Sequence, residues 1–172
     1  MKIYYKTEYK SPIGNIIICC DENENIIGLW FKWQKYFADN IDGNFIVNDK
    51  LKIFTKTKIW LNKYFAGKKT NIKEIPVRFM GTTFQKSVWK ILCKIPYGKV
   101  TTYGDIAKQI AKQRGITKMS AQSIGNAVGH NPVSIIVPCH RVLGKNGNLT
   151  GYAAGLDKKK FLLDLEQPNM IK

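Results

Sequence analysis

The first 36 residues alternate between short apolar runs and polar turns, which is the pattern of β-strands joined by tight connections. The predicted strands are residues 4–9, 15–20 and 26–32. The segment Ser11-Pro12-Ile13-Gly14 has the composition of a turn. Residues 36–49 are polar, and we expect no regular element there. Apolar residues at helical spacing over 50–66 predict one amphipathic helix, which Gly67 would end.

From residue 81 onward the apolar positions follow a helical period. The residues that define the first helix of this half are Phe84, Val88, Ile91, Leu92 and Ile95. The predicted helices begin at Thr82 or Thr83, at Thr101 or Thr102, and near Ser120. The threonine hydroxyls can act as N-caps. The third of these helices is expected to end near residue 129.

A lysine-rich stretch, residues 67–74, separates the two patterns and is followed by Ile75-Pro76. We therefore predict two domains, residues 1–75 and 76–172. The predicted fold class is α/β (α+β). It combines a small N-terminal domain, with an antiparallel sheet plus a helix, and a mainly helical C-terminal domain with a helix-turn-helix.

The candidate helix-turn-helix consists of the second and third predicted helices of the C-terminal half. Their connection, residues 112–118, is longer than the usual tight turn. The third helix is almost free of large or charged side chains, whereas a major-groove reader carries Arg, Asn or Gln toward base edges. Such a helix can lie close to DNA in the minor groove without sequence preference. The alternative is a helix packed tightly inside the domain.

The net charge of +16 at pH 7 is concentrated in the second half of the chain. Residues 1–75 hold 13 Lys/Arg against 8 Asp/Glu, whereas residues 76–172 hold 15 against 4. A basic half suggests a polyanionic partner, with nucleic acid first. The alternative is that lysines spread over all faces simply keep the protein solvated.

The four cysteines are not arranged as a metal site or as an evident disulfide framework, since none forms a C-x-x-C pair. Cys19 and Cys20 are adjacent, so on a strand they would point to opposite faces. The N-terminus lacks the apolar region of a signal peptide, and no apolar run has the length of a membrane span. We therefore expect a cytoplasmic protein with free thiols and no membrane partner.

The strongest candidate for chemistry is Cys139. An apolar, strand-like run over 135–137 precedes it, and His140 and Arg141 follow. A thiolate is the nucleophilic form of cysteine, and a neighbouring base or cation favours it. A catalytic His needs an orienting acid, and Glu166 lies in an apolar helical segment, 161–166. The alternatives are that Cys139 is a small buried side chain without chemistry and that Glu166 is a solvated helix end.

Several segments in order resemble one family. They are Asn131 to Val142 (NPVSIIVPCHRV), with GYAAGL and FLLDLE after it and IPYGKV before it. This constellation resembles the methylated-DNA–protein-cysteine methyltransferases, also called O6-alkylguanine-DNA alkyltransferases. The resemblance is dense over 81–166 and looser over 1–75.

The resemblance implies specific roles. Cys139 would be the alkyl acceptor, His140 a base acting through water, and Glu166 the group that orients it. Asn131 would brace the turn that holds the cysteine, and Tyr103 would crowd a DNA phosphate and donate a proton to the leaving guanine. The remaining residues expected at the substrate or DNA are Gln122, Ser123, Gly125, Asn126, Arg141, Val142, Tyr152 and Ala153.

The implied function is repair of DNA by direct, stoichiometric transfer of a methyl or small alkyl group from guanine O6 to Cys139. Thymine O4 is a second candidate position. The base would be flipped out of the duplex to reach the thiol. No cofactor is implied. The partner would be double-stranded DNA contacted in its minor groove, and the protein would act as a monomer.

This sequence departs from the family pattern at two positions. Gln122 stands where many members have an arginine that fills the space left by the flipped base, and Ala153 stands where some have serine. Some members hold zinc in the N-terminal domain. Both histidines of this chain, His130 and His140, lie later, so we predict no metal site.

Two rival functions remain at this stage. A lesion sensor or a helix-turn-helix regulator would bind DNA without chemistry, and a cysteine hydrolase would use Cys139 and His140 without DNA. The sequence leaves open the preferred alkyl size, the role of the N-terminal domain and cooperation between proteins along DNA.

Overall fold

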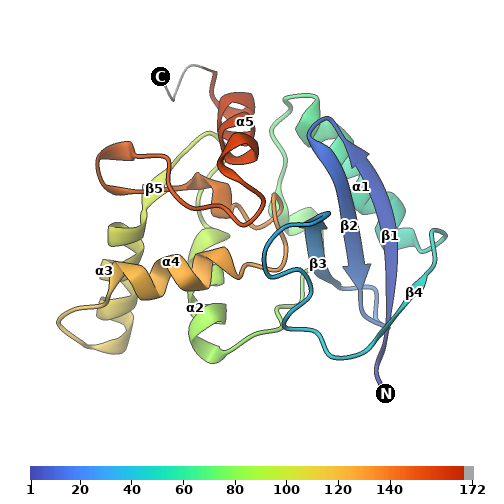
Figure 1. Ribbon diagram of the computed structural model, residues 1–172, viewed down its shortest axis with the longest axis horizontal. Coiled ribbons are helices and arrows are strands. Elements are labelled where there is room, and N and C mark those ends of the chain that lie inside the picture. The colour runs from blue at the N-terminus through green and yellow to red at the C-terminus, as the bar shows by residue number, and fades with distance from the viewer. Residues whose placement is uncertain (169–172) are drawn as a thin grey trace. The chain divides into compact units, whose positions relative to one another are not determined.

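The computed structural model describes residues 1–168, which form two compact units (Figure 1). The first unit comprises Met1–Met80 and Pro132–Ile136. The second comprises Gly81–Asn131 and the described residues from Val137 onward. The return of 132–136 to the first unit has no signal in the sequence. The predicted domain boundary after residue 75 stays a prediction.

The first unit is built on a four-stranded sheet with the order β3-β2-β1-β4. The strands are β1 (Ile3–Ser11), β2 (Gly14–Cys20), β3 (Ile26–Phe31) and β4 (Asn44–Val47). β1 and β3 pair antiparallel with β2, as predicted, but β4 pairs parallel with β1. The expectation of no element over 36–49 is therefore wrong, and the predicted antiparallel sheet contains one parallel pair as well. β4 is a short edge strand whose Ile46 and Val47 are exposed, so it carries no alternating pattern.

Helix α1 (Lys52–Phe65) lies alongside the sheet (Figure 1). The Tyr9 ring stacks on Phe65, and the Tyr9 hydroxyl hydrogen bonds to Asn62 at 2.7 Å. The helix ends as predicted, with Gly67 at a φ of 75° that favours glycine. A short 3-10 helix, η1 (Ile72–Glu74), follows.

The second unit is mainly helical. Its elements are α2 (Thr83–Leu92), β5 (Thr101–Thr102), α3 (Tyr103–Arg114), α4 (Ala121–Gly129), η2 (Cys139–Arg141), β6 (Val142–Leu143), η3 (Lys145–Gly147) and α5 (Leu156–Glu166). Thr82 and Thr102 cap α2 and α3, as predicted from their hydroxyls, and Ser120 caps α4. The indole N–H of Trp89 donates to the carbonyl of Ala127 at 2.8 Å, which fastens α2 to α4. The short strands β5 and β6 pair in parallel.

Helices α3 and α4 form the predicted helix-turn-helix (Figure 1). The small residues of α4 divide between two faces. Ile124, Ala127 and Val128 are buried, whereas the exposed positions include Gln122 and Ser123. One face of this helix therefore packs in the unit, as the alternative interpretation expected, while the other face is exposed and its contact with DNA stays a prediction.

The apolar run before the cysteine is not a strand, contrary to expectation. Ile135 has a φ of 69°, and the N–H of Ile136 bonds to the carbonyl of Ser134 at 2.8 Å. Such local hydrogen bonds take the place of pairing with a neighbouring strand. In this segment only Val133 forms a β-bridge. A short, fully buried apolar run does not by itself distinguish a strand from a turn.

Candidate active site

Cys139 lies at the start of η2 and is 6% exposed. Asn131 braces this turn, since its side-chain amide donates to the carbonyl of Val137 at 2.9 Å and also hydrogen bonds to the Cys139 thiol. Burial raises the pKa of Cys139, while the Asn131 contact and the charge of Lys159 act in the opposite direction. In the free protein the thiol is therefore held protonated and needs a base.

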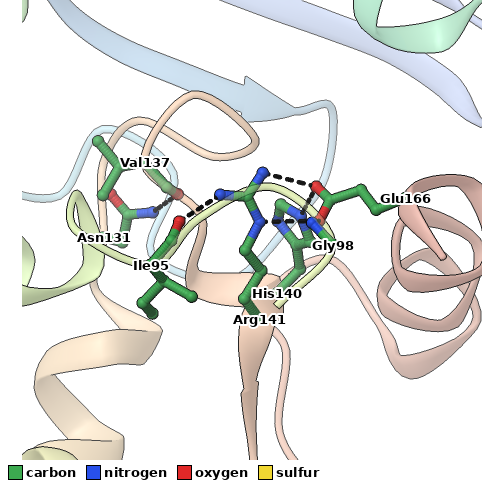
Figure 2. A network of polar contacts seen from close by, with 7 residues as sticks. All are labelled: Ile95, Gly98, Asn131, Val137, His140, Arg141 and Glu166. Atoms are coloured by element: carbon green, nitrogen blue, oxygen red, sulfur yellow. Dashed lines mark hydrogen bonds and ion pairs between the residues drawn. The ribbon is translucent and has the colours of Figure 1, made fainter. Parts of the chain in front are cut away.

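Glu166 is the centre of a buried network of polar contacts (Figure 2). Nε2 of His140 lies 2.6 Å from Oε1 of Glu166, and Nε and Nη2 of Arg141 donate to the two carboxylate oxygens at 2.8 and 2.9 Å. The backbone N–H of Gly98 donates at 3.2 Å. Burial by itself would raise the pKa of Glu166, but His140 and Arg141 more than offset it and hold that pKa well below its usual range. Glu166 is therefore ionised and is not a solvated helix end.

His140 is fully buried, and this burial lowers its pKa despite the carboxylate beside it. A neutral imidazole with Nε2 facing a carboxylate carries its proton on Nε2. Nδ1 is then the basic nitrogen. The pair has the arrangement that a general base needs, an imidazole whose tautomer is fixed by an acid.

Arg141 is placed differently from the expected DNA contact. Its side chain is 10% exposed, and besides Glu166 it donates from Nη1 to the carbonyl of Ile95 at 2.6 Å. It also lies over the Tyr97 ring, 5.7 Å from the centroid. The guanidinium is thus committed to contacts within the unit, and the expected contact of Arg141 with DNA stays a prediction.

The cation whose charge favours the Cys139 thiolate is Lys159, which the sequence analysis missed. Lys159 is fully buried, and its Nζ donates to the carbonyls of Thr150 and Gly151 at 2.6 and 3.0 Å. Burial lowers the pKa of Lys159 to about 8. A signal was present in the sequence, because Lys159 shares the helical spacing of the buried residues Leu162, Leu163 and Glu166.

Tyr103 lies at the start of α3, where its hydroxyl donates to the carbonyl of Thr150 at 3.2 Å and accepts from Lys159 at 3.4 Å. Burial, followed by the influence of Cys139, raises the pKa of Tyr103 to about 12. The hydroxyl is therefore protonated at neutral pH and able to donate. The influence of Cys139 on its pKa indicates that the two groups are near each other.

A cavity of about 820 Å³ opens beside Tyr103. Its walls come from the start of α3, the exposed face of α4 and the loop 145–151, and they include Gln122, Gly125, Lys108 and Lys145. Gly125 lies where α4 passes Tyr103, since an added Cβ would lie 3.8 Å from that ring. The structure thus brings Tyr103, Gln122 and Gly125 to one hollow, and their expected contact with DNA stays a prediction.

The other expected contact residues fall at several places in the second unit. Ser123 and Asn126 are exposed on α4. Val142 is buried in β6 beside Thr101, so only its backbone is suited to a substrate. Tyr152 and Ala153 are half-buried in the segment that leads to α5. The roles of these residues stay predictions.

Within residues 1–168, no cluster of three or more His, Cys, Asp or Glu side chains could hold a metal ion. Over the same residues, no helix is long and apolar enough to cross a membrane. Cys19, Cys20 and Cys93 also have pKa values raised by burial, to about 12, 12 and 11.

Comparison with protein families matches residues 3–79 to the ribonuclease-like domain of 6-O-methylguanine DNA methyltransferase. Residues 83–168 match the DNA binding domain of the same protein. The chain belongs to the 6-O-methylguanine DNA methyltransferase family. The resemblance stated from the segment around Cys139 is thereby confirmed.

Relatives in this family align along nearly the whole chain. The methylated-DNA–protein-cysteine methyltransferase of Haemophilus influenzae is 39% identical over 97% of this chain and 88% of that protein. The protein of the same name from Methanosarcina acetivorans is 42% identical over 94% and 97%. A crystal structure of Mycobacterium tuberculosis OGT in complex with DNA matches with a TM-score of 0.80 at 36% identity, over 96% of this chain and 92% of that one. The predicted fold class is confirmed by this likeness.

Proposed function

We propose that this protein repairs DNA by taking a methyl or small alkyl group from O6 of guanine onto Sγ of Cys139, once per protein molecule. The observation that carries the proposal is the buried Cys139 turn, which Asn131 braces and which lies next in sequence to the His140–Glu166 pair. Membership of the 6-O-methylguanine DNA methyltransferase family supports the same reaction. Alkylated thymine O4 is a second candidate substrate.

The proton of the Cys139 thiol must leave before Sγ can attack. The neutral His140 is suited to take this proton through a bridging water, and Glu166 stabilises the resulting imidazolium. The thiolate electron pair forms the C–S bond as the C–O6 bond breaks, and the electrons of that bond pass to the guanine. Lys159 supplies the positive charge that favours the thiolate.

The leaving guanine needs a proton, and the Tyr103 hydroxyl is the proposed donor. Its raised pKa keeps it protonated, and its present partner is the Thr150 carbonyl. Lys159 bonds to the same carbonyl, so this oxygen keeps a donor when Tyr103 turns to the substrate. Lys159 is therefore a positioning residue as well as a local charge.

The DNA would lie on the exposed face of α4 with its minor groove toward Gln122 and Gly125, and the alkylated base would be flipped out. Flipping costs a few kcal/mol, and less for a poorly paired alkylated base. Lys108 and Lys145, which line the hollow beside this face, are suited to phosphate contacts. We propose that the protein binds as a monomer.

A thioether carbon has no activated leaving group, so the alkylated protein would not turn over. This feature separates the proposal from a cysteine hydrolase, which would release its product. A regulator that only binds DNA would need neither the buried His140–Glu166 pair nor a braced thiol. A mass measurement distinguishes the three.

The test is intact-mass analysis after incubation with duplex DNA that contains O6-methylguanine. We expect one added methyl, about 14 Da, on the peptide that contains Cys139, at a limit of one per protein. Cys139→Ser should abolish the addition, and Cys93→Ser, at a cysteine outside the site, should leave it unchanged. Addition elsewhere, or repair beyond one equivalent, would contradict the proposal.

A further inference from the structure

The two faces of the sheet in the first unit are covered differently. Tyr9 packs with α1 on one face, and Tyr4, an odd number of positions away along the same strand, points to the other. That other face carries a core cluster with Trp30 and Cys19, against which Ala38 and Ile41 of the β3–β4 connection pack. A connecting segment, and not a helix, therefore covers this face.

Between the connection and the sheet lies a half-enclosed cavity of about 440 Å³. Ile17, Cys19 and Phe45 line it from the sheet, and Trp33 and Phe37 line it from the connection. This volume falls in the range of small-molecule sites, whose walls are mostly apolar and aromatic with few polar groups. Burial raises the pKa of the Cys19 thiol to about 12, so Cys19 contributes a neutral surface.

The connection carries backbone strain at the mouth of this cavity. Trp33, Tyr36 and Ala38 have φ values of 70°, 59° and 55°, a region that favours glycine. The Trp33 side chain is 90% exposed, and Phe37 is also exposed. Strained backbone that holds an aromatic ring in solvent beside an apolar hollow is a feature of binding sites, because packing alone does not favour it.

The charged groups that line the cavity are both lysines, Lys6 and Lys32. Lys32 has an exposed ion pair with Glu8 at 3.4 Å, with both side chains 44% exposed, and such a pair contributes little. Lys6 is half-buried, and its positive charge acts to lower the pKa of Cys19 on the cavity wall, against the larger effect of burial. A ligand here meets aromatic walls together with positive charge.

We propose that this cavity of the first unit is a binding site for a small planar aromatic anion, with the ring between Trp33 and the apolar wall and the anionic group at Lys6. Aromatic side chains favour a flat ring, and a half-buried lysine favours a carboxylate, sulfonate or phosphate. The inference does not rest on the proposed repair reaction. A neutral apolar ligand would leave Lys6 without a counter-charge at the cavity wall.

Trp33 provides a direct readout. The other three tryptophans, Trp30, Trp60 and Trp89, are at most 4% exposed, so only Trp33 is open to a quencher in water. The probe is 2-naphthoate, with uncharged 2-naphthamide as its matched partner. Saturable 2-naphthoate binding at one site by calorimetry should protect Trp33 from acrylamide quenching. Binding absent at millimolar probe would overturn the proposal.

Variants test the location. Lys6→Ala should weaken 2-naphthoate by about tenfold and leave 2-naphthamide nearly unchanged, because it removes one charge-assisted contact. Trp33→Ala should weaken both ligands in calorimetry and should fold normally, since this side chain is exposed. Lys35→Ala, an exposed lysine of the same connection that does not line the cavity, is the control. Unchanged affinity in both Lys6→Ala and Trp33→Ala would place the ligand elsewhere and overturn the proposal.

Discussion

His140 and Glu166 face each other across 2.6 Å, with the two side chains 0% and 1% exposed. Arg141 joins the same carboxylate, so one acid serves both a base and a permanent cation. This sharing separates two functions of Glu166. One is to orient His140 for proton transfer, and the other is to neutralise a buried guanidinium that the fold has placed beside it.

The first prediction separates those functions by mutation. Glu166→Gln leaves Arg141 buried without its carboxylate, so we expect a loss of about 3–5 kcal/mol in the free energy of unfolding. In urea denaturation, the double variant should lose much less free energy of unfolding than the sum of the losses in Glu166→Gln and Arg141→Met. At equal folded fraction, Glu166→Gln should slow single-turnover alkyl transfer more than Arg141→Met does. Additive stabilities would contradict the shared network.

The second prediction concerns the dependence of stability on pH. The pKa of His140 is lowered in the folded protein, so the unfolded chain takes up its proton first as the pH falls below about 6.5. The pKa of Glu166 is also lowered, and a second loss should follow below about 4.3. The stability contributed by these two groups should thus be full above the upper value and fall on acidification. Denaturation of His140→Gln across this range should lack the first step, and an unchanged profile would count against it.

The third prediction concerns Lys159. Lys159→Met keeps the apolar stem but removes the charge and the bonds to Thr150 and Gly151. We expect the pH profile of Cys139 alkylation by iodoacetamide to move to higher pH, and single-turnover transfer to slow by about tenfold, the effect of one charged contact. Lys160→Met, at an exposed neighbour paired with Asp164, is the control. A profile that does not move would leave Lys159 a purely structural role.

Stability gives a second readout for Lys159. Its folded-state pKa is about 8, below the ordinary value of 10.5, so the unfolded chain binds more protons between these values. The stability of the wild-type protein should therefore rise with pH across this window through this group. Lys159→Met should be without that rise.

Local signals account for most of what the sequence predicted. Thr82, Thr102 and Ser120 cap helices through bonds to residues two or three positions away, so each start is encoded nearby. The strand β4 depends on pairing with β1, some 40 positions earlier, and all of its residues except Phe45 are exposed. No local pattern encodes that pairing, and the strand was missed.

The candidate site divides in the same way. Cys139, His140 and Glu166 could be named from their residue types and from the family resemblance. Lys159 stands among three consecutive lysines, and only its helical spacing with Leu162 and Leu163 distinguishes it from the other two, so the lysine run concealed its burial. Arg141 was expected to contact DNA because no residue near it in the sequence predicts its burial. Its acidic partner, Glu166, lies 25 positions away.

The fourth prediction concerns DNA affinity. Binding should tolerate sequence changes and fall steeply with salt, because phosphate contacts release counterions. Lys108 and Lys145 line the hollow beside Tyr103, so Lys108→Ala and Lys145→Ala should each reduce the slope of log K against log salt by about 0.9. Lys94→Ala, an exposed lysine of the second unit that does not line this hollow, should change the slope less. Equal slopes in all three variants would remove the assignment of these lysines to phosphates.

The last prediction concerns Gln122, which is exposed in the first turn of α4 and lines the same hollow as Tyr103. A flipped base leaves a gap in the duplex, and a side chain must occupy it or the base returns. Gln122 offers an amide that can hydrogen bond to a base edge but carries no charge. Gln122→Arg should therefore fold normally and tighten DNA binding, most at low salt, with a steeper salt slope by about 0.9.

Removal of the amide gives the sharper experiment. Gln122→Ala should slow repair of duplex DNA by about tenfold, the effect of one hydrogen bond to a base, and should hardly change the reaction with free O6-alkylguanine. The free base needs no flipping, so it reports the pocket and the thiol alone. Gln113→Ala, the same change at an exposed position of α3 that does not line the hollow, is the control. Equal slowing on both substrates would mean that Gln122 supports the fold or the pocket, and its place in the duplex gap would have to be abandoned.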